Sequence, residues 1–245
     1  MSNLFVSYLK TFWATMGAGW QERAAYLEAL YLSLGAGLYT KQRYLDIGSG
    51  NDKTTSYIGK SFTESFGLDL KSPKDSPTSR GNLIRIVGNA ESLPFRDSSF
   101  DVVSMISLIE HVVKKEDAIR EALRVLRPGG ELLIEVPNRY FPLDFHYGGP
   151  NLLFLPHTVK SRVLAGIGYT DIPSPKRLEE LVTKAEPQII IQQKQIIWPS
   201  KVLPSWLRPL YSLMKNLGVF RVFPFGHFLL CQKTRQRVIT EGQEE

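Results

Sequence analysis

The stretch Tyr44-Leu45-Asp46-Ile47-Gly48-Ser49-Gly50 decides the fold of this 245-residue chain. Its apolar first half predicts a buried strand, and its two glycines let the backbone turn tightly and approach a ligand where a Cβ would collide. Asp69 follows nineteen residues after Gly50, at the end of a second strand-like segment, Ser65-Phe66-Gly67-Leu68-Asp69-Leu70. Because a carboxylate at this spacing can accept hydrogen bonds from ribose hydroxyls, the two features together predict a nucleoside site.

The residues after the glycine turn indicate which nucleoside the chain binds. A dinucleotide fingerprint would place a third glycine at position 53, where a pyrophosphate meets a helix N-terminus, but this chain has Lys53. We expect the neighbouring carboxylate of Asp52 to repel a pyrophosphate and to tolerate, or favour, a cationic or zwitterionic ligand such as S-adenosylmethionine. A complete Walker motif is also absent from the sequence. The sequence therefore favours S-adenosylmethionine over NAD or ATP.

From this point the chain resembles the class I S-adenosylmethionine-dependent methyltransferases, particularly the type 11 and ubiquinone/menaquinone biosynthesis groups. Five blocks match that family's motifs in order: Leu45 to Gly50, Gly67 to Asp69, Gly88 to Phe95, Ser99 to Val103 and Leu126 to Ile134. The chain departs from the family at Asp52, where a third glycine is common, and at Asn89, where an Asp is usual. Asn89 can still hydrogen-bond an adenine edge, so we interpret both residues as tolerable variations.

The resemblance implies an α/β fold, with a Rossmann-like seven-stranded sheet, helices on both faces, an amphipathic N-terminal segment and an insertion before the last strand. Apolar runs predict its buried parallel strands near 43–47, 65–70, 83–88, 100–106 and 131–136. A helix is predicted over Lys114–Leu126, ended by Pro128-Gly129-Gly130, and another over Pro175–Ala185. The segments Gln188–Ile197 and Phe228–Gln232 predict a closing antiparallel pair.

We expect a methyltransferase domain over residues 41–245, preceded by an N-terminal helical cap over 1–40 that covers the cleft, packs on the core or touches lipid. Within the domain, 139–174 is predicted to cover the substrate and 198–226 to be a basic, aromatic insertion. Seven basic residues and no acidic residue lie from Trp198 to Arg237. This composition suits a segment that binds a membrane interface or a lipid-linked anionic acceptor. The alternative is that the segment packs on the sheet or forms a dimer contact.

The resemblance implies that the cofactor lies beyond the carboxyl ends of the strands. The glycine turn would pass along the methionine part of the cofactor, Asp69 would bind the ribose, and Leu70 would pack beside the adenine. Asp46 would orient the turn or approach the ammonium group through water. The predicted cofactor-binding residues are Asp46, Gly48, Ser49, Gly50, Asp69, Leu70, Asn89, Ala90, Ser107 and Leu108.

Methyl transfer from a sulfonium requires an aligned acceptor, exclusion of water and, for a hydroxyl acceptor, a base. Histidine titrates near neutrality, so His146 and His111 are the predicted catalytic residues. Tyr147 and His157 are predicted to contact the substrate. A structural role is the alternative for each histidine.

Glu110-His111 resembles part of a Glu-x-x-Glu-His pattern that is tied to a divalent metal in ubiquinone-pathway O-methyltransferases. Ser107 replaces the first Glu of that pattern here. Two side chains are too few to hold a divalent metal ion without ligands from elsewhere in the protein. We therefore expect no essential metal and interpret Glu110 as a helix-entry residue.

Composition limits the remaining possibilities. The chain has 43% hydrophobic residues, a formal net charge of +6 and a single cysteine, Cys231, which fits a reducing compartment. Neither a secretory leader nor a run of eighteen uncharged apolar residues is present in the sequence, so we expect a cytoplasmic protein that can also lie peripherally on a membrane. Nucleic acid is disfavoured as a partner, because no zinc-ligand spacing or RNA-binding aromatic motif accompanies the charge. The oligomeric state is not indicated.

The sequence thus predicts an S-adenosylmethionine-dependent methyltransferase. The expected acceptor is an oxygen of a lipophilic small molecule or of a lipid-linked or glycan acceptor. A noncatalytic S-adenosylmethionine-binding scaffold is one alternative, and Asp52 and Asn89 are the features that would support it. A nicotinamide-dependent oxidoreductase is the other, and Lys53 argues against it.

Overall fold

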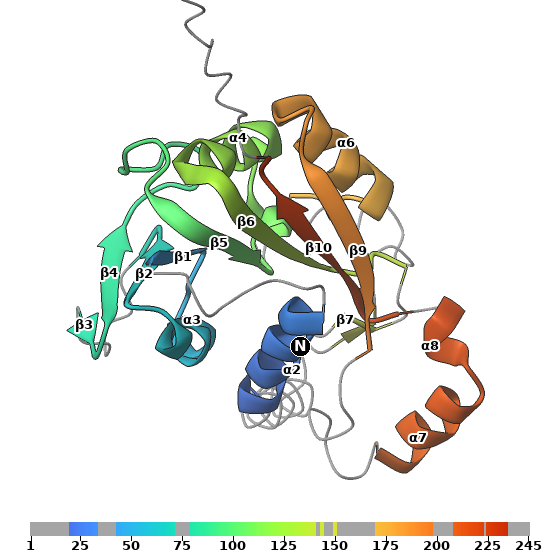
Figure 1. Cartoon of the computed structure of the whole chain (residues 1–245). Helices are drawn as coiled ribbons and strands as arrows, with labels where there is room; N and C mark the ends of the chain where they lie inside the picture. Colours follow the sequence, from blue (N-terminus) through green and yellow to red (C-terminus); the bar gives the residue numbers. More distant parts are fainter. Residues whose placement is uncertain are drawn as a thin grey trace, which may run out of the picture.

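A computed structural model of the chain describes residues 20–33, 43–71, 79–140, 143–144, 149–150, 170–197, 208–222 and 224–234. The described residues form an eight-stranded sheet in the order β3-β4-β2-β1-β5-β6-β10-β9 (Figure 1). Its strands are β1 (Arg43–Ile47), β2 (Glu64–Asp69), β3 (Ser79–Arg80), β4 (Leu83–Val87), β5 (Phe100–Ile106), β6 (Leu126–Pro137), β9 (Ile190–Ile196) and β10 (Gly226–Gln232). Two further short strands, β7 (Leu143–Asp144) and β8 (Gly149–Pro150), pair with each other.

The strand directions identify the fold. Strand β1 pairs in parallel with β2 and β5, β2 pairs in parallel with β4, and β5 pairs in parallel with β6. Strand β10 runs antiparallel to both β6 and β9. The predicted Rossmann-like sheet with a closing antiparallel pair is therefore confirmed, and β3 is a two-residue antiparallel addition at its edge.

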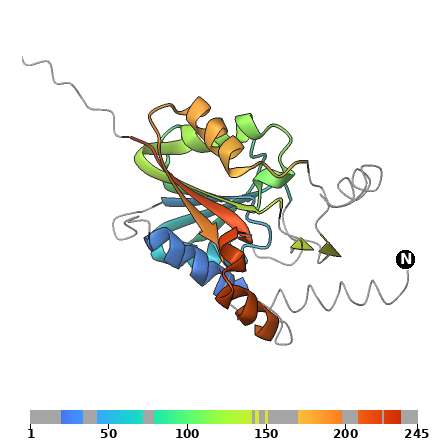
Figure 2. The same ribbon diagram turned by 90° about the vertical axis from the view of Figure 1, so that its right-hand side faces the viewer.

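Helices cover both faces of the sheet (Figures 1 and 2). Helices α4 (Lys115–Val125) and α6 (Pro175–Ala185) contact each other on one face, and α2 (Trp20–Ser33) and α3 (Lys53–Ile58) contact each other on the other. Two single turns, η2 (Gly59–Ser61) and η3 (Ile109–His111), follow α3 and β5. Helices α7 (Arg208–Asn216) and α8 (Val219–Val222) lie between β9 and β10 in the chain.

The hydrophobic pattern explains these two layers. In α4, Ala118, Ile119 and Ala122 recur at three- and four-residue spacing, and all three are fully buried in the larger hydrophobic cluster. On the other face, Tyr211 of α7 stacks on Phe220 with a ring separation of 4.9 Å, and Phe220 stacks on Phe225 at 4.8 Å. These rings belong to a hydrophobic cluster that also contains Phe228 and Leu230 of β10, so part of the predicted basic insertion shares a core with the sheet.

One predicted boundary differs from the structure. Helix α4 ends at Val125, and Leu126 is already extended and paired with Phe100. The segment Pro128-Gly129-Gly130 lies within the bounds of β6, at the point where the register with β5 shifts and where Gly129 has φ +78°. The amide of Ser99 donates a 2.7 Å hydrogen bond to the carbonyl of Val125, which draws the chain into the sheet as soon as the helix ends.

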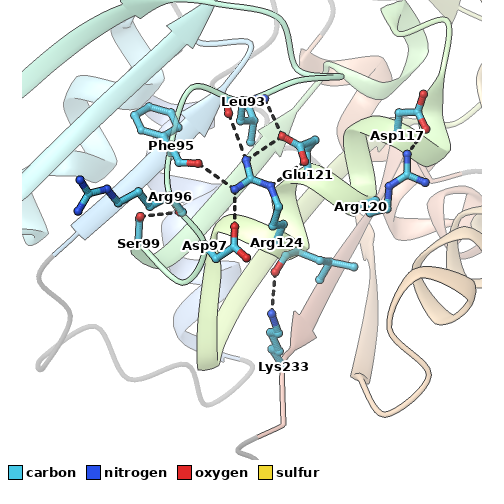
Figure 3. Close-up of polar contacts among 11 residues, drawn as sticks. Leu93, Phe95, Arg96, Asp97, Ser99, Asp117, Arg120, Glu121, Arg124 and Lys233 are labelled. Carbon is cyan, nitrogen blue, oxygen red and sulfur yellow. Dashed lines mark hydrogen bonds and ion pairs between the residues drawn. The ribbon is translucent and has the colours of Figure 1, made fainter.

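Arg124, near the end of α4, fixes the loop that follows β4 (Figure 3). Its guanidinium donates hydrogen bonds to both carboxylate oxygens of Glu121, at 2.7 and 2.8 Å, and to Asp97 at 2.7 Å. It also donates to the carbonyls of Leu93 and Phe95, at 3.1 and 2.8 Å. One arginine thus anchors the segment that leaves the predicted adenine-binding block.

Candidate functional site

A cavity of about 400 Å³ lies at the carboxyl ends of β1, β2, β4 and β5. This is the edge of an open α/β sheet where ligands bind, and the volume is in the range of small-molecule sites. Seven residues of the predicted cofactor set and one predicted catalytic residue, His111, line it together with five further residues. The lining residues are Gly48, Leu68, Asp69, Leu70, Gly88, Asn89, Ala90, Glu91, Ser107, Leu108, His111, Val112 and Val113.

The turn after β1 has the conformation that its glycines allow. Gly48 has φ +81°, and its amide donates a 2.7 Å hydrogen bond to the carbonyl of Leu68 at the end of β2. A Cβ at position 48 would lie 2.7 Å from Cδ1 of Leu108, which itself lines the cavity. Position 48 therefore requires glycine for its backbone angle and for its contact with Leu108.

Asp69 contacts this turn directly. Its Oδ2 accepts a 2.9 Å hydrogen bond from the amide of Gly50, and its Oδ1 accepts one of 3.3 Å from the amide of Lys71. A carboxylate oxygen has two acceptor positions, so each oxygen keeps capacity for a further donor. The carboxylate is thus held at the cavity by backbone amides and can still accept hydrogen bonds from a diol.

Two apolar side chains of the lining are unusually exposed. Leu70 is 68% exposed and Val113 is 76% exposed. A large exposed apolar residue is ordinary when it stands alone, but two that line the same cavity suit a flat, weakly polar ring such as adenine. Leu70 belongs to the predicted set, whereas Val113 does not, because nothing in its local pattern distinguishes it from a loop residue.

The block after β4 forms a tight turn at the cavity. Oδ1 of Asn89 accepts a 3.0 Å hydrogen bond from the amide of Glu91, and Ala90 is almost fully buried. Glu91 in turn accepts a 3.0 Å bond from the amide of Lys114, just before α4. The Asn89 side chain therefore shapes its own loop while it lines the cavity.

Asp46 lies beneath the turn and is only 3% exposed. One carboxylate oxygen accepts a 2.6 Å hydrogen bond from Ser104 Oγ, and the other accepts one from Thr55 Oγ1. Burial raises the pKa of Asp46 to about 6; the two hydroxyl donors lower it, and the charge of Asp69 raises it. This geometry fits a role in orienting the turn, one of the two roles considered for Asp46, because the carboxylate is not part of the cavity lining.

The expectation about Asp52 is wrong. Its carboxylate is buried and forms an ion pair with Arg85 of β4, so its charge is compensated within the protein. It does not line the cavity, and it therefore does not offer a net negative charge to a ligand. Sequence spacing alone gave no indication of Arg85, which is thirty-three residues away.

Arg23 and Glu135 are two further residues that the sequence did not reveal. Arg23 of α2 donates a 2.6 Å hydrogen bond to Ser107 Oγ and a 3.1 Å bond to Glu135 Oε2. Ser107 Oγ donates a 2.6 Å bond to the same carboxylate oxygen, and Ser107 has φ +51°. The three residues join α2 to the ends of β5 and β6 at the wall of the cavity, and they come from segments far apart in the chain.

The predicted catalytic residues divide into two groups. His111, in η3, lines the cavity, whereas its neighbour Glu110 is fully buried. His146, Tyr147 and His157 lie outside the described residues. Within the described ranges, no group of three or more His, Cys, Asp or Glu side chains is arranged to hold a metal ion.

Comparisons with known proteins agree with this architecture. Residues 45–134 match a family described as a methyltransferase domain. The chain is 34% identical over 110 residues to the ubiquinone/menaquinone biosynthesis C-methyltransferase UbiE of Azotobacter vinelandii, covering 40% of this chain and 44% of that protein. It is 31% identical over 134 residues to UbiE of Cronobacter sakazakii, covering 49% and 53%. The matched segments thus span about half of the length of these curated relatives.

Solved structures share the fold at low sequence identity. An S-adenosylmethionine-dependent methyltransferase from Mesorhizobium loti superposes with a TM-score of 0.58 at 12% identity, covering 84% of this chain and 97% of that one. Phosphoethanolamine N-methyltransferase 2 of Haemonchus contortus, in complex with S-adenosyl-L-methionine, gives a TM-score of 0.56 at 16% identity, covering 85% and 52%. These similarities establish the fold.

Proposed function

We propose that the chain, whose residues 45–134 match a family described as a methyltransferase domain, is a class I S-adenosylmethionine-dependent methyltransferase and that it methylates a lipophilic acceptor. The observation that carries the proposal is the contact between the glycine turn and Asp69 at the mouth of the cavity. An amide-anchored carboxylate beside a bare backbone suits the ribose of an adenosyl group and the thin aliphatic chain attached to it. Leu70 and Val113 would then flank the adenine.

The residues of the cavity support the chemistry of methyl transfer. Bound S-adenosylmethionine supplies an electrophilic methyl group, and the acceptor atom supplies the electron pair of the new bond. The chain has to align the acceptor, exclude water and take up the proton that a hydroxyl acceptor loses. His111 lines the cavity and is our candidate for the base that takes up that proton. His146 remains a second candidate from the sequence.

The acceptor atom is the finer part of the proposal. We favour an oxygen of a lipophilic small molecule or lipid-linked acceptor, because a histidine lines the cavity and a hydroxyl acceptor needs a base. A carbon acceptor is the second candidate, and the similarity to the UbiE C-methyltransferases favours it. Either acceptor atom is compatible with the lipophilic acceptor that we propose.

A membrane surface is the partner that we propose for such an acceptor. Leu210, Leu213 and Leu217 are 55%, 55% and 71% exposed, and their spacing places them on one side of α7 and its extension. All the charged residues from Trp198 to Arg237 are basic. No helix in the described part of the chain is long and apolar enough to cross a bilayer. The exposed leucines beside basic residues support contact with an anionic membrane surface, and sedimentation with anionic vesicles, but not with neutral ones, is the expected result.

Transfer of a radiolabelled methyl group tests the function. The purified protein is incubated with labelled S-adenosylmethionine and a cell extract that has been separated into lipid, small-molecule, protein and RNA fractions. We expect label in an organic-soluble product, and we expect the Asp69→Ala variant to lose it. Label in protein or RNA would contradict the lipophilic acceptor, and absence of label from every fraction would contradict the enzymatic function.

A further inference from the structure

Asp52 and Arg85 form a buried ion pair at the end of the cofactor turn. Their side chains are 7% and 3% exposed. Burying two charges costs more than their attraction returns unless the geometry is good, and removing one partner leaves the other charge uncompensated. Stability alone therefore does not explain a buried ion pair here, and we expect the pair to position the turn.

The backbone of Asp52 explains why it needs an anchor. Asp52 has φ +60° and ψ +9°, the left-handed conformation in which glycine is the unstrained residue. Its amide donates a 2.9 Å hydrogen bond to the carbonyl of Ser49, and its carbonyl accepts a 2.8 Å bond from Ser56 in α3. The residue therefore closes the turn and begins the helix, in a conformation that an Asp adopts only at a cost.

Gly67 provides the space that the ion pair occupies. Strand β2 lies between β4 and β1 in the sheet, so Arg85 has to pass over β2 to reach Asp52. Gly67 of β2 is the register partner of Arg85, which places both positions on the same face of the sheet. A Cβ on Gly67 would lie 2.9 Å from Asp52 Oδ1 and 2.9 Å from Ser49 Oγ. A side chain at position 67 would therefore push the turn out of place.

We propose that Asp52, Arg85 and Gly67 together position the Gly48 to Gly50 turn for the cofactor, in place of a third glycine at position 52. Asp52 and Arg85 do not line the cavity, so they act as positioning residues rather than as ligands of the cofactor. The ion pair holds a strained residue in the left-handed conformation, and the bare backbone of Gly67 leaves room for the Asp52 carboxylate. This inference rests on the proposed function, because it concerns the same cofactor turn.

A double-mutant cycle on cofactor affinity tests the proposal. Binding of S-adenosylmethionine is measured by calorimetry for the wild type, for Arg85→Met, for Asp52→Gly and for the double variant. We expect Arg85→Met to raise Kd at least about tenfold, because a buried carboxylate without its counterion would draw the turn toward water. We expect Asp52→Gly to raise Kd about threefold or more, because it leaves the guanidinium buried and unpaired. The double variant has glycine at position 52 and no buried charge, and we expect its Kd to return to within about threefold of the wild type.

Arg43→Met is the matched control. Arg43 also contacts a carboxylate, that of Glu64 at 2.9 Å, and lies 5.0 Å from the ring of Phe66, but it stands at the amino end of β1, opposite the cavity. Its loss is expected to lower the melting temperature without changing Kd. A purely structural role of the Asp52–Arg85 pair would behave in the same way, so the change in Kd and its rescue are the deciding readouts.

The outcomes separate this inference from the proposed function. A wild type that binds S-adenosylmethionine, with a Kd that Arg85→Met leaves unchanged, would overturn the inference alone. So would a folded double variant that binds no better than the single variants. If Arg85→Met does not fold, the double variant still decides, because we expect it to fold and to bind. A wild type that does not bind the cofactor would overturn both the proposed function and this inference.

Discussion

The backbone amide of Gly50 donates a 2.9 Å hydrogen bond to Oδ2 of Asp69, so the turn after β1 and the end of β2 are joined within the protein itself. A ligand that meets this site finds the carboxylate already oriented by two backbone amides, those of Gly50 and Lys71. Orientation before binding reduces the entropy lost when the ligand is bound. The relationship makes Asp69 the residue whose loss tests the site most simply.

Replacing Asp69 by Ala is expected to weaken S-adenosylmethionine binding by about 1 to 3 kcal/mol, or roughly five- to 150-fold in Kd, through lost charge-assisted hydrogen bonds. Calorimetric titration measures the change. Glu64→Ala is the control, because Glu64 begins the same strand and its side chain is half exposed. An unchanged Kd for Asp69→Ala would remove Asp69 from the ribose role.

Replacing Arg23 by Ala is expected to raise the Kd for S-adenosylmethionine about three- to tenfold, because it removes the donor that joins α2 to Ser107 and Glu135 at the cavity wall. The effect is modest since the side chain is one-third exposed. Glu28→Ala, on the same helix, removes only an exposed 3.3 Å contact with Ser61 and is expected to leave Kd unchanged. Equal Kd values for the two variants would contradict a role of Arg23 at the site.

Asp46 is expected to make the stability of the cofactor-free protein depend on pH. Its pKa is raised by burial to about 6, above the ordinary 3.8, so the folded state binds the proton more tightly than the unfolded state. The contribution of Asp46 to folding is therefore greatest at low pH, falls as pH rises from about 4 to about 6, and is level above that, with a total change on the order of 3 kcal/mol. Urea unfolding of the wild type and of Asp46→Asn between pH 4.5 and 7.5 measures this difference.

The asparagine variant at position 46 is expected to gain stability relative to the wild type as pH rises from 4.5 to about 6, and the difference is expected to stay constant above that. The exposed Glu180→Gln variant is the comparison and is expected to retain the wild-type profile. A constant difference between Asp46→Asn and the wild type over this pH range would show that Asp46 does not titrate there.

Two arginines of α4 are expected to differ in their effect on stability. Arg124 holds Glu121, Asp97 and the loop after β4, and its loss is expected to cost about 2 to 3 kcal/mol in the free energy of unfolding (Figure 3). Arg120, 64% exposed, pairs only with Asp117 among the contacts drawn there, and its loss is expected to cost less than about 0.5 kcal/mol. Chemical denaturation of the two alanine variants measures both values, and equal costs would contradict the anchoring role of Arg124.

The fold was largely predictable from the sequence because its strongest signals are local. The run that ends at Ile47 is a buried strand, and the spacing of Ala118, Ile119 and Ala122 is an amphipathic helix, as the structure has them. The order of the five sequence motifs then predicts a parallel sheet, and in such sheets ligands bind at the carboxyl ends of the strands. The exact end of α4 was less predictable, because Leu126 leaves the helix to pair with Phe100, which is a tertiary contact, and Pro128-Gly129-Gly130 marks instead the shift in register between β6 and β5.

The polar contacts around the site were not predictable in the same way. Arg23 is eighty-four residues from Ser107, and Arg85 is paired across an intervening strand with Asp52. No periodicity connects such residues, since their proximity arises only when the sheet is assembled. This explains why the prediction for Asp52 was wrong. In the sequence its carboxylate looks like a charge that is available to a ligand, whereas in the folded protein Arg85 compensates that charge.

A crystal structure of the protein with S-adenosylmethionine tests the central claim most directly. We predict that both ribose hydroxyls lie within hydrogen-bonding distance of the Asp69 carboxylate, that the adenine lies between Leu70 and Val113, and that the methionine part passes over Gly48. Ligand bound elsewhere on the molecule, with the cavity beside Asp69 empty, would contradict the account.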